Sequence, residues 1–396
     1  MKKFLKAIYS FVVRSLYLQR KTLELRTEEG HNLLVIRGDG LGDLLLALPA
    51  LRHFKESFGA CRITLLTRRE WVDIAKLFPY VDELIAWDKE QYARSIFYRL
   101  RFIRKLRGHF YAVAIHSTYS REPLADEILC CCLATQKIGF DGNLNNILAK
   151  QKAKNDPCYT RLIKPIASGP LEIDRNRDFA EQVTGKQIAA VDFQPQIRLP
   201  ESDRMAAVKL LRDAGLKPES DLIVALFPGA SWDAKLWPFD AYAQLADKIL
   251  NYYPARIVIC GAAADVRGVE KVQVKMNGPA VNLAGKTTLR ELAAVFEACD
   301  LFIGNDTGPL HLAVSVGTPT LGIIGGGHFG RFYPYGNLSR HRMVHKQMDC
   351  YYCDWKCIHE TVRCIQEITV EDVWRETHRM IEEVVLPARA LRGNER

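Results

Sequence analysis

The sequence has no long apolar run. It holds 396 residues, 48% of them hydrophobic, yet no stretch approaches the roughly 20 apolar residues of a membrane-spanning helix. A credible secretion signal is also missing, because Arg14 interrupts the first apolar stretch early and no small-residue cleavage site follows. These absences predict a cytoplasmic protein, and its length predicts two domains.

The sequence also has no long arginine tract. Its net charge of +9 is spread along the chain, which excludes a nucleic-acid footprint and favours anionic small molecules or a membrane surface. Basic residues recur at helical spacing in residues 1–31, with apolar residues filling the remaining arc. This N-terminal basic amphipathic extension suits peripheral attachment to an anionic inner membrane. A surface helix packed on the N-terminal domain fits the pattern equally well.

Most of the eleven cysteines are not spaced as they are in small domains held together by disulfides. Seven are scattered through apolar segments, which indicates a reducing cytosol, and Cys130, Cys131 and Cys132 are expected to be packing residues. The other four, Cys350, Cys353, Cys357 and Cys364, have the spacing C-x2-C-x3-C-x6-C. That spacing predicts a structural knot, either a disulfide or a metal site for zinc or an iron–sulfur cluster, rather than a catalytic centre.

Short apolar runs alternate with helical patterns in two blocks. The runs are residues 32–38, 62–67, 83–88, 111–117 and 137–141, then 222–229, 255–261, 281–285, 301–306 and 318–325. Near-continuous Val, Ile and Leu predicts parallel strands covered on both faces. The expected fold is therefore α/β, with two Rossmann-like domains facing each other across a cleft.

The expected domains follow from these blocks. After the extension come an N-terminal domain over 32–200, a C-terminal domain over 201–370 that holds the cysteine cluster, and a C-terminal helix and tail over 371–396. Residues 142–220 show no clean periodicity, and the segment from Pro195 to Pro200 is a candidate linker.

The first apolar run ends in a glycine loop, RGDGLGD. Gly38, Gly40 and Gly42 allow a tight turn before a helix, but their spacing is not the dinucleotide fingerprint, which disfavours a nicotinamide enzyme. Asp43 at the helix N-terminus could take a proton from an incoming hydroxyl. A cap on its own helix is the competing interpretation.

The second block opens with a candidate phosphate loop. Gly229, Ala230 and Ser231 can present backbone N–H groups and a hydroxyl to phosphate. Lys235 adds a positive charge that would offset the charge on a departing phosphate. A solvated surface lysine is the alternative interpretation.

A second polar loop lies between two apolar runs. Gly308 frees a helix N-terminus for an anion, Thr307 can donate to a phosphate oxygen, and Asp306 can accept from ribose hydroxyls or orient a loop. His311, one turn into that helix, is either a ligand contact or a buried structural histidine.

Four motifs in this order resemble glycosyltransferase family 9, the ADP-heptose:lipopolysaccharide heptosyltransferases. They are GLGD, PGASWDAKLWP, DTGPLHLA and GTPTLGIIG, which together span most of residues 32–335. The resemblance implies a GT-B fold and an inverting transfer that needs no metal. It makes Asp43 the base that activates the acceptor, Lys235 a phosphate and sugar contact, and residues 306–308 with His311 the nucleotide-sugar pocket.

The implied donor is ADP-heptose, bound mainly by the C-terminal domain, and the implied acceptor is a lipopolysaccharide core or related lipid-linked glycan. The phosphate loop departs from the threonine-containing form expected of some members. Two alternatives stay open: a related transferase with another nucleotide sugar or acceptor, and a non-catalytic nucleotide- or glycan-binding protein.

Overall fold

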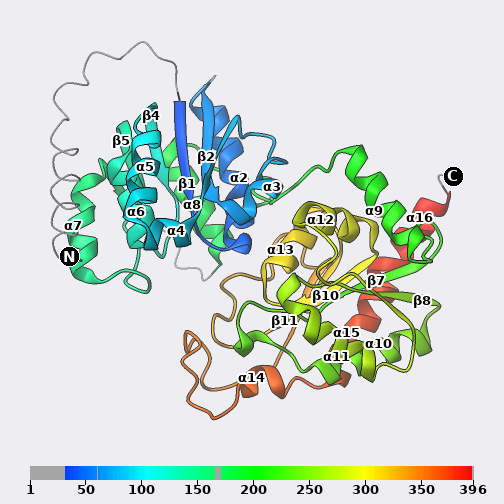
Figure 1. The fold of residues 1–396 in the computed structure, drawn as a ribbon. Coiled ribbons are helices and arrows are strands. Elements are labelled where there is room, and N and C mark those ends of the chain that lie inside the picture. The colour runs from blue at the N-terminus through cyan, green and yellow to red at the C-terminus, as the bar shows by residue number, and fades with distance from the viewer. Residues whose placement is uncertain (1–31, 60, 166–170, 395–396) are drawn as a thin grey trace. The chain divides into compact units, whose positions relative to one another are not determined.

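The computed structural model describes residues 32–59, 61–165 and 171–394. The amphipathic extension predicted over 1–31 lies outside them. The described chain forms two compact units, each built around one six-stranded parallel sheet with helices packed against it (Figure 1). The predicted α/β class with two Rossmann-like domains is confirmed. No described helix is both long and apolar enough to cross a membrane.

The first sheet has the strand order β3-β2-β1-β4-β5-β6. Its strands are β1 (Asn32–Arg37), β2 (Arg62–Arg68), β3 (Glu83–Trp87), β4 (Phe110–His116), β5 (Leu133–Phe140) and β6 (Arg161–Ile163). Its helices are α2 (Leu41–Ser57), α3 (Val72–Ala75), α4 (Lys89–Arg94), α5 (Ile96–Leu106), α6 (Pro123–Cys131), α7 (Ala149–Asn155) and α8 (Glu172–Thr184). Strand β1 is buried on both faces along almost its whole length, as its LLVI run predicts.

The second sheet has the order β12-β11-β10-β7-β8-β9. Its strands are β7 (Leu222–Phe227), β8 (Ala255–Ile259), β9 (Ala280–Asn282), β10 (Leu301–Asn305), β11 (Thr320–Ile324) and β12 (His341–His345). Its helices are α9 (Glu201–Asp213), α10 (Phe239–Tyr252), α11 (Val266–Lys275), α12 (Leu289–Ala298), α13 (Gly308–Ser315), α14 (Arg363–Gln366), α15 (Val370–Met380) and α16 (Leu386–Asn394). A π-helical turn, Ile381–Val385, joins the last two helices.

Both sheets place a topological switch point at their centre. In the first sheet β1 and β4 are neighbours, and the chain leaves them toward opposite edges; β7 and β10 have the same relation in the second sheet. Loops after such strand pairs diverge at the carboxyl edge and leave room for a ligand. The glycine loop follows β1, the candidate phosphate loop follows β7, and the second polar loop follows β10.

One cysteine prediction was wrong. Cys131 and Cys132 are buried packing residues, as expected, but Cys130 forms a disulfide with Cys158 across a Cα separation of 5.3 Å. Cys130 lies near the end of α6, beside the 3-10 turn Asp156–Cys158. Five of the seven scattered cysteines are therefore free and buried, and the other two are cross-linked to each other.

Candidate active site

Asn305, the last residue of β10, joins the two loops of the second switch point. Its side chain is fully buried, and its Nδ2 donates to the carbonyls of Pro228 and Gly229 at 2.9 and 3.3 Å. Its Oδ1 accepts from the Trp237 backbone N–H at 3.2 Å and from the Tyr242 hydroxyl at 3.0 Å. Because one amide satisfies partners on both sides, it fixes the phosphate loop against the end of β10.

Lys235 and Asp306 meet beside this amide. The Lys235 Nζ donates to the Asp306 carboxylate at 3.1 Å and to the Asp306 carbonyl at 2.9 Å. The side chains are only 16% and 7% exposed. Burial alone would raise the pKa of the Asp306 carboxyl, but the charge of Lys235 and the hydrogen bond from its ammonium outweigh burial, and the pKa is lowered. Lys235 is therefore a mostly buried cation fixed by Asp306, and not a solvated surface lysine.

Two aromatic rings lie near the Lys235 ammonium. Its Nζ lies 5.5 Å from the ring centre of Trp355 and 5.9 Å from that of Phe332. The Trp355 indole N–H donates to His328 Nδ1 at 3.2 Å, and His328 Nε2 pairs with Asp354 at 2.6 Å. The sequence reasoning missed this group. Its one local signal is His328, a polar residue shortly after the carboxyl end of β11.

The predicted nucleotide loop forms the start of α13. Thr307 is the N-cap residue with extended backbone, and Gly308 and Pro309 begin the helix. Pro309 has no N–H and the Leu310 N–H donates to the Thr307 carbonyl at 3.1 Å, so the Gly308 N–H is the group that this first turn can offer to a ligand. His311 is 3% exposed and shares a 3.0 Å hydrogen bond with the Tyr335 hydroxyl. Burial lowers its pKa to about 4, Asp306 opposing and Lys235 reinforcing the shift. The His311 ring is therefore neutral near pH 7.

The phosphate loop runs from buried to exposed. Gly229 is buried, Ala230 is half-buried and Ser231 is exposed. A Cβ at Gly229 would lie 2.3 Å from the Asp265 carboxylate, so only glycine lets the loop pass there. Asp265 stands just after β8, and burial raises its pKa although the Ala262 N–H donates to it. The sequence reasoning did not single it out.

A buried ion pair supports the start of the glycine loop, directly after β1. The Arg37 guanidinium, 2% exposed, pairs with Asp39 at 2.7 Å and donates to the Ser117 carbonyl at 2.7 Å. The Thr118 hydroxyl donates to the same Asp39 carboxylate at 3.2 Å. Asp39 thus connects the loop after β1 to the loop after β4. A Cβ at Gly38 would lie 2.2 Å from the Trp87 ring, which explains that glycine.

Asp43 lies in the first turn of α2 and is half-buried. Gly40 opens the helix, since the Leu44 N–H donates to its carbonyl at 3.0 Å. A Cβ at Gly40 would lie 3.2 Å from an Asp43 carboxylate oxygen, so the carboxylate turns back toward the helix start. This position suits a cap and equally presents a carboxylate at the carboxyl edge of β1, where Gly42 is half-buried beside it.

A sequence model described as glycosyltransferase family 9 (heptosyltransferase) matches residues 99–357, more than half of the chain. The chain belongs to glycosyltransferase family 9. It is therefore a glycosyltransferase, as the motifs predicted. The matched region contains Lys235, Asp306 and the first three cysteines of the cluster.

Individual relatives are more distant. The lipopolysaccharide core heptosyltransferase OpsX of Haemophilus influenzae is 24% identical over 330 residues, which cover 82% of this chain and 88% of the relative. A family 9 glycosyltransferase from Veillonella parvula superposes with a TM-score of 0.72 at 21% identity, covering 89% and 97% of the two chains. The E. coli ADP-heptose LPS heptosyltransferase II gives 0.69 at 19%, covering 89% and 99%. These likenesses establish the GT-B fold.

Proposed function

We propose that this glycosyltransferase moves a heptosyl group from ADP-heptose to a lipopolysaccharide core or a related lipid-linked glycan. The observation that carries the proposal is the Lys235–Asp306 pair at the switch point between β7 and β10. A partly buried ammonium beside a glycine loop and a helix N-terminus is suited to a diphosphate. The names of the H. influenzae and E. coli relatives supply the sugar and the acceptor.

The donor site is proposed on the second unit. Gly229, Ala230 and Ser231 offer N–H groups and a hydroxyl to the diphosphate, and Thr307 with Gly308 offers the start of α13. One carboxylate oxygen of Asp306 accepts from Lys235 and orients the ammonium. The carboxylate has further lone pairs that could accept from sugar hydroxyls. His311, which shares a hydrogen bond with the Tyr335 hydroxyl, stands one turn into the same helix and is the further donor contact of this proposal.

Transfer is proposed to invert the anomeric carbon. Asp43 accepts the proton of the acceptor hydroxyl while the oxygen of that hydroxyl forms a bond to the anomeric carbon. The bond from the anomeric carbon to the diphosphate breaks. ADP leaves with the electron pair. Lys235 and the loop N–H groups offset the charge that builds on the leaving phosphate, so this proposed step assigns no role to a metal.

A donor panel tests the proposal. Purified protein is incubated with ADP-heptose and with UDP- and GDP-sugars, with and without a heptose-deficient core oligosaccharide, and release of nucleoside diphosphate is followed. Release of ADP from ADP-heptose that depends on the acceptor supports the proposal. Release from a different donor moves the substrate, and binding of ADP without any release across the panel points to a binding protein.

We propose that residues 1–31 attach the protein to the cytoplasmic face of the inner membrane. A lipid-linked acceptor is presented at a membrane surface, and the basic residues of this segment suit anionic lipid. A truncated protein that starts at residue 31 is expected to lose binding to anionic liposomes. Equal binding of the full chain and the truncated protein would contradict the proposal.

A further inference from the structure

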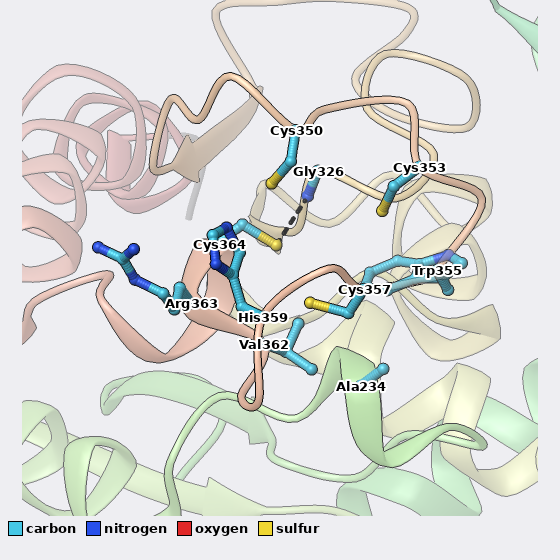
Figure 2. Close-up of a pocket in the computed structure, with 10 residues that line it drawn as sticks. All are labelled: Ala234, Gly326, Cys350, Cys353, Trp355, Cys357, His359, Val362, Arg363 and Cys364. Atoms are coloured by element: carbon cyan, nitrogen blue, oxygen red, sulfur yellow. Dashed lines mark hydrogen bonds between the residues drawn. The ribbon is translucent and has the colours of Figure 1, made fainter.

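Four cysteines surround one small cavity in the second unit. Cys350, Cys353 and Cys357 lie in the loop between β12 and α14, and Cys364 lies in α14. Their sulfur atoms border a common space of about 20 Å³ (Figure 2). All four are free thiols. The spacing seen in the sequence therefore becomes a spatial cluster.

The backbone of this loop holds unusual conformations. Tyr352, Asp354 and Trp355 have φ values of 66°, 51° and 59°, which residues with a side chain rarely adopt. Each such residue costs free energy and persists only where its surroundings hold it in place. The loop has no helix or strand between His345 and Arg363, and the Tyr352 and Asp354 N–H groups donate to the carbonyls of Gly326 and Gly327 at 2.9 and 3.1 Å. A cross-link among the four cysteines would hold the rest of the loop in place.

The chemistry and size of the cavity identify the cross-link. Four thiols offer the soft sulfur ligands that zinc and iron prefer in tetrahedral sites. A space of about 20 Å³, enough for one water molecule, accommodates a single metal ion. The Gly326 backbone N–H already donates to Cys364 Sγ at 3.3 Å, a bond that also stabilises a thiolate.

We propose that these four cysteines bind a single zinc or iron ion as a tetrathiolate site. Each thiol gives its proton to solvent and forms one sulfur–metal bond, so no oxidant or reductant is needed for a divalent ion. No three potential ligands among the described residues already stand close enough to hold a metal. Binding therefore draws the sulfurs inward, and Arg363 and His359 line the same cavity beside the resulting negative charge.

The metal site would fix the position of Trp355, which packs beside Lys235. Trp355, between Cys353 and Cys357, lies so close to Gly327 that a Cβ there would be 2.4 Å from the indole. The same indole donates to His328 and lies over the Lys235 ammonium. A loop released from its metal would free Trp355 from this position. The site is therefore a structural support for the donor pocket, an inference that rests on the proposed function.

Metal content tests the site without reference to activity. Protein purified under reducing conditions without chelators is analysed for zinc and iron, and metal-free protein is titrated with Co²⁺, whose thiolate complexes absorb in the visible region. One ion per chain and a tetrathiolate Co²⁺ spectrum support the proposal. Neither bound metal nor a Co²⁺–thiolate spectrum overturns it.

Cys357→Ser is the sharpest variant, because Cys357 is exposed and its loss leaves the core intact. It is expected to lower metal content at least tenfold, whereas Cys158→Ser, which removes a cysteine of the first unit, retains one ion per chain. Undiminished metal in Cys357→Ser overturns the ligand assignment.

The supporting role is measured as ADP affinity by calorimetry. Removing the metal is expected to weaken ADP binding about tenfold, and restoring zinc or iron to recover it. Unchanged affinity on metal removal overturns the supporting role while leaving the metal site. An absence of ADP binding in the metal-loaded protein would instead count against the proposed function.

Discussion

Replacing Lys235 with Met tests the catalytic role proposed for the lysine, and it also removes the structural contribution of the lysine. Met keeps the length of the side chain but removes the charge, leaving the Asp306 carboxylate, 7% exposed, without its 3.1 Å partner. Breaking a buried pair from one side costs about 3–5 kcal/mol, and the 16% exposure of Lys235 places the cost near 3 kcal/mol. Losing a donor that stabilises developing charge costs about 100- to 1,000-fold in kcat.

The double variant Lys235→Met with Asp306→Asn distinguishes these effects. Asn is neutral, so the double variant is expected to recover most of the lost free energy of unfolding, measured by chemical denaturation. Its turnover, measured as ADP release, should stay at least 100-fold below that of the native enzyme. Lys286→Met is the matched control, because this exposed lysine of the same unit also bonds a backbone carbonyl. Native turnover in Lys235→Met, or turnover restored in the double variant, would refute the reasoning.

Three further predictions concern other parts of the two units. Asp43→Asn is expected to lower turnover at least 100-fold with ADP binding intact, whereas Asp73→Asn, also in the first turn of a helix, should leave turnover unchanged; equal small effects on stability alone would favour the capping role. Asn305→Leu leaves several buried partners unsatisfied and should lower the free energy of unfolding by about 3 kcal/mol, and a loss below about 1 kcal/mol would contradict its bridging role. Burial lowers the pKa of His311 and of His341 to about 4, below the ordinary 6.5, so the unfolded chain binds more protons between these values. Stability should therefore be full above pH 6.5 and fall as the pH drops toward 4, and His341→Asn should make that fall shallower in urea titrations; an identical slope would count against it.

The buried strands could be predicted because a parallel strand covered on both faces must be apolar almost throughout. The six residues of β7, all buried, are such a case. Strand β6 has only three residues and β12 reads HRMVH, so neither shows this signal. Residues 142–220, which lack clean periodicity, nevertheless contain α7, β6, α8 and α9. Their helices are rich in charge, and the sheet and its neighbours select their positions.

The loops of the candidate site could be predicted one at a time, but the contacts between them could not. Lys235 and Asp306 were each identified within their own motif, while their contact across 71 positions depends on β7 and β10 being neighbours. Trp355 and His328 escaped notice because their role comes from a loop that folds back over the glycines after β11. The Cys130–Cys158 bond likewise follows from the packing of α6, which no spacing rule reveals.

The most direct test of the proposed function is the mass of the acceptor after reaction with ADP-heptose. A heptose-deficient lipid-linked core is incubated with the native enzyme, and the glycan is analysed by mass spectrometry while ADP is quantified. The account predicts an increase of one heptosyl residue per acceptor, with one ADP released for each. An unmodified acceptor in the presence of intact, bound ADP-heptose would contradict it.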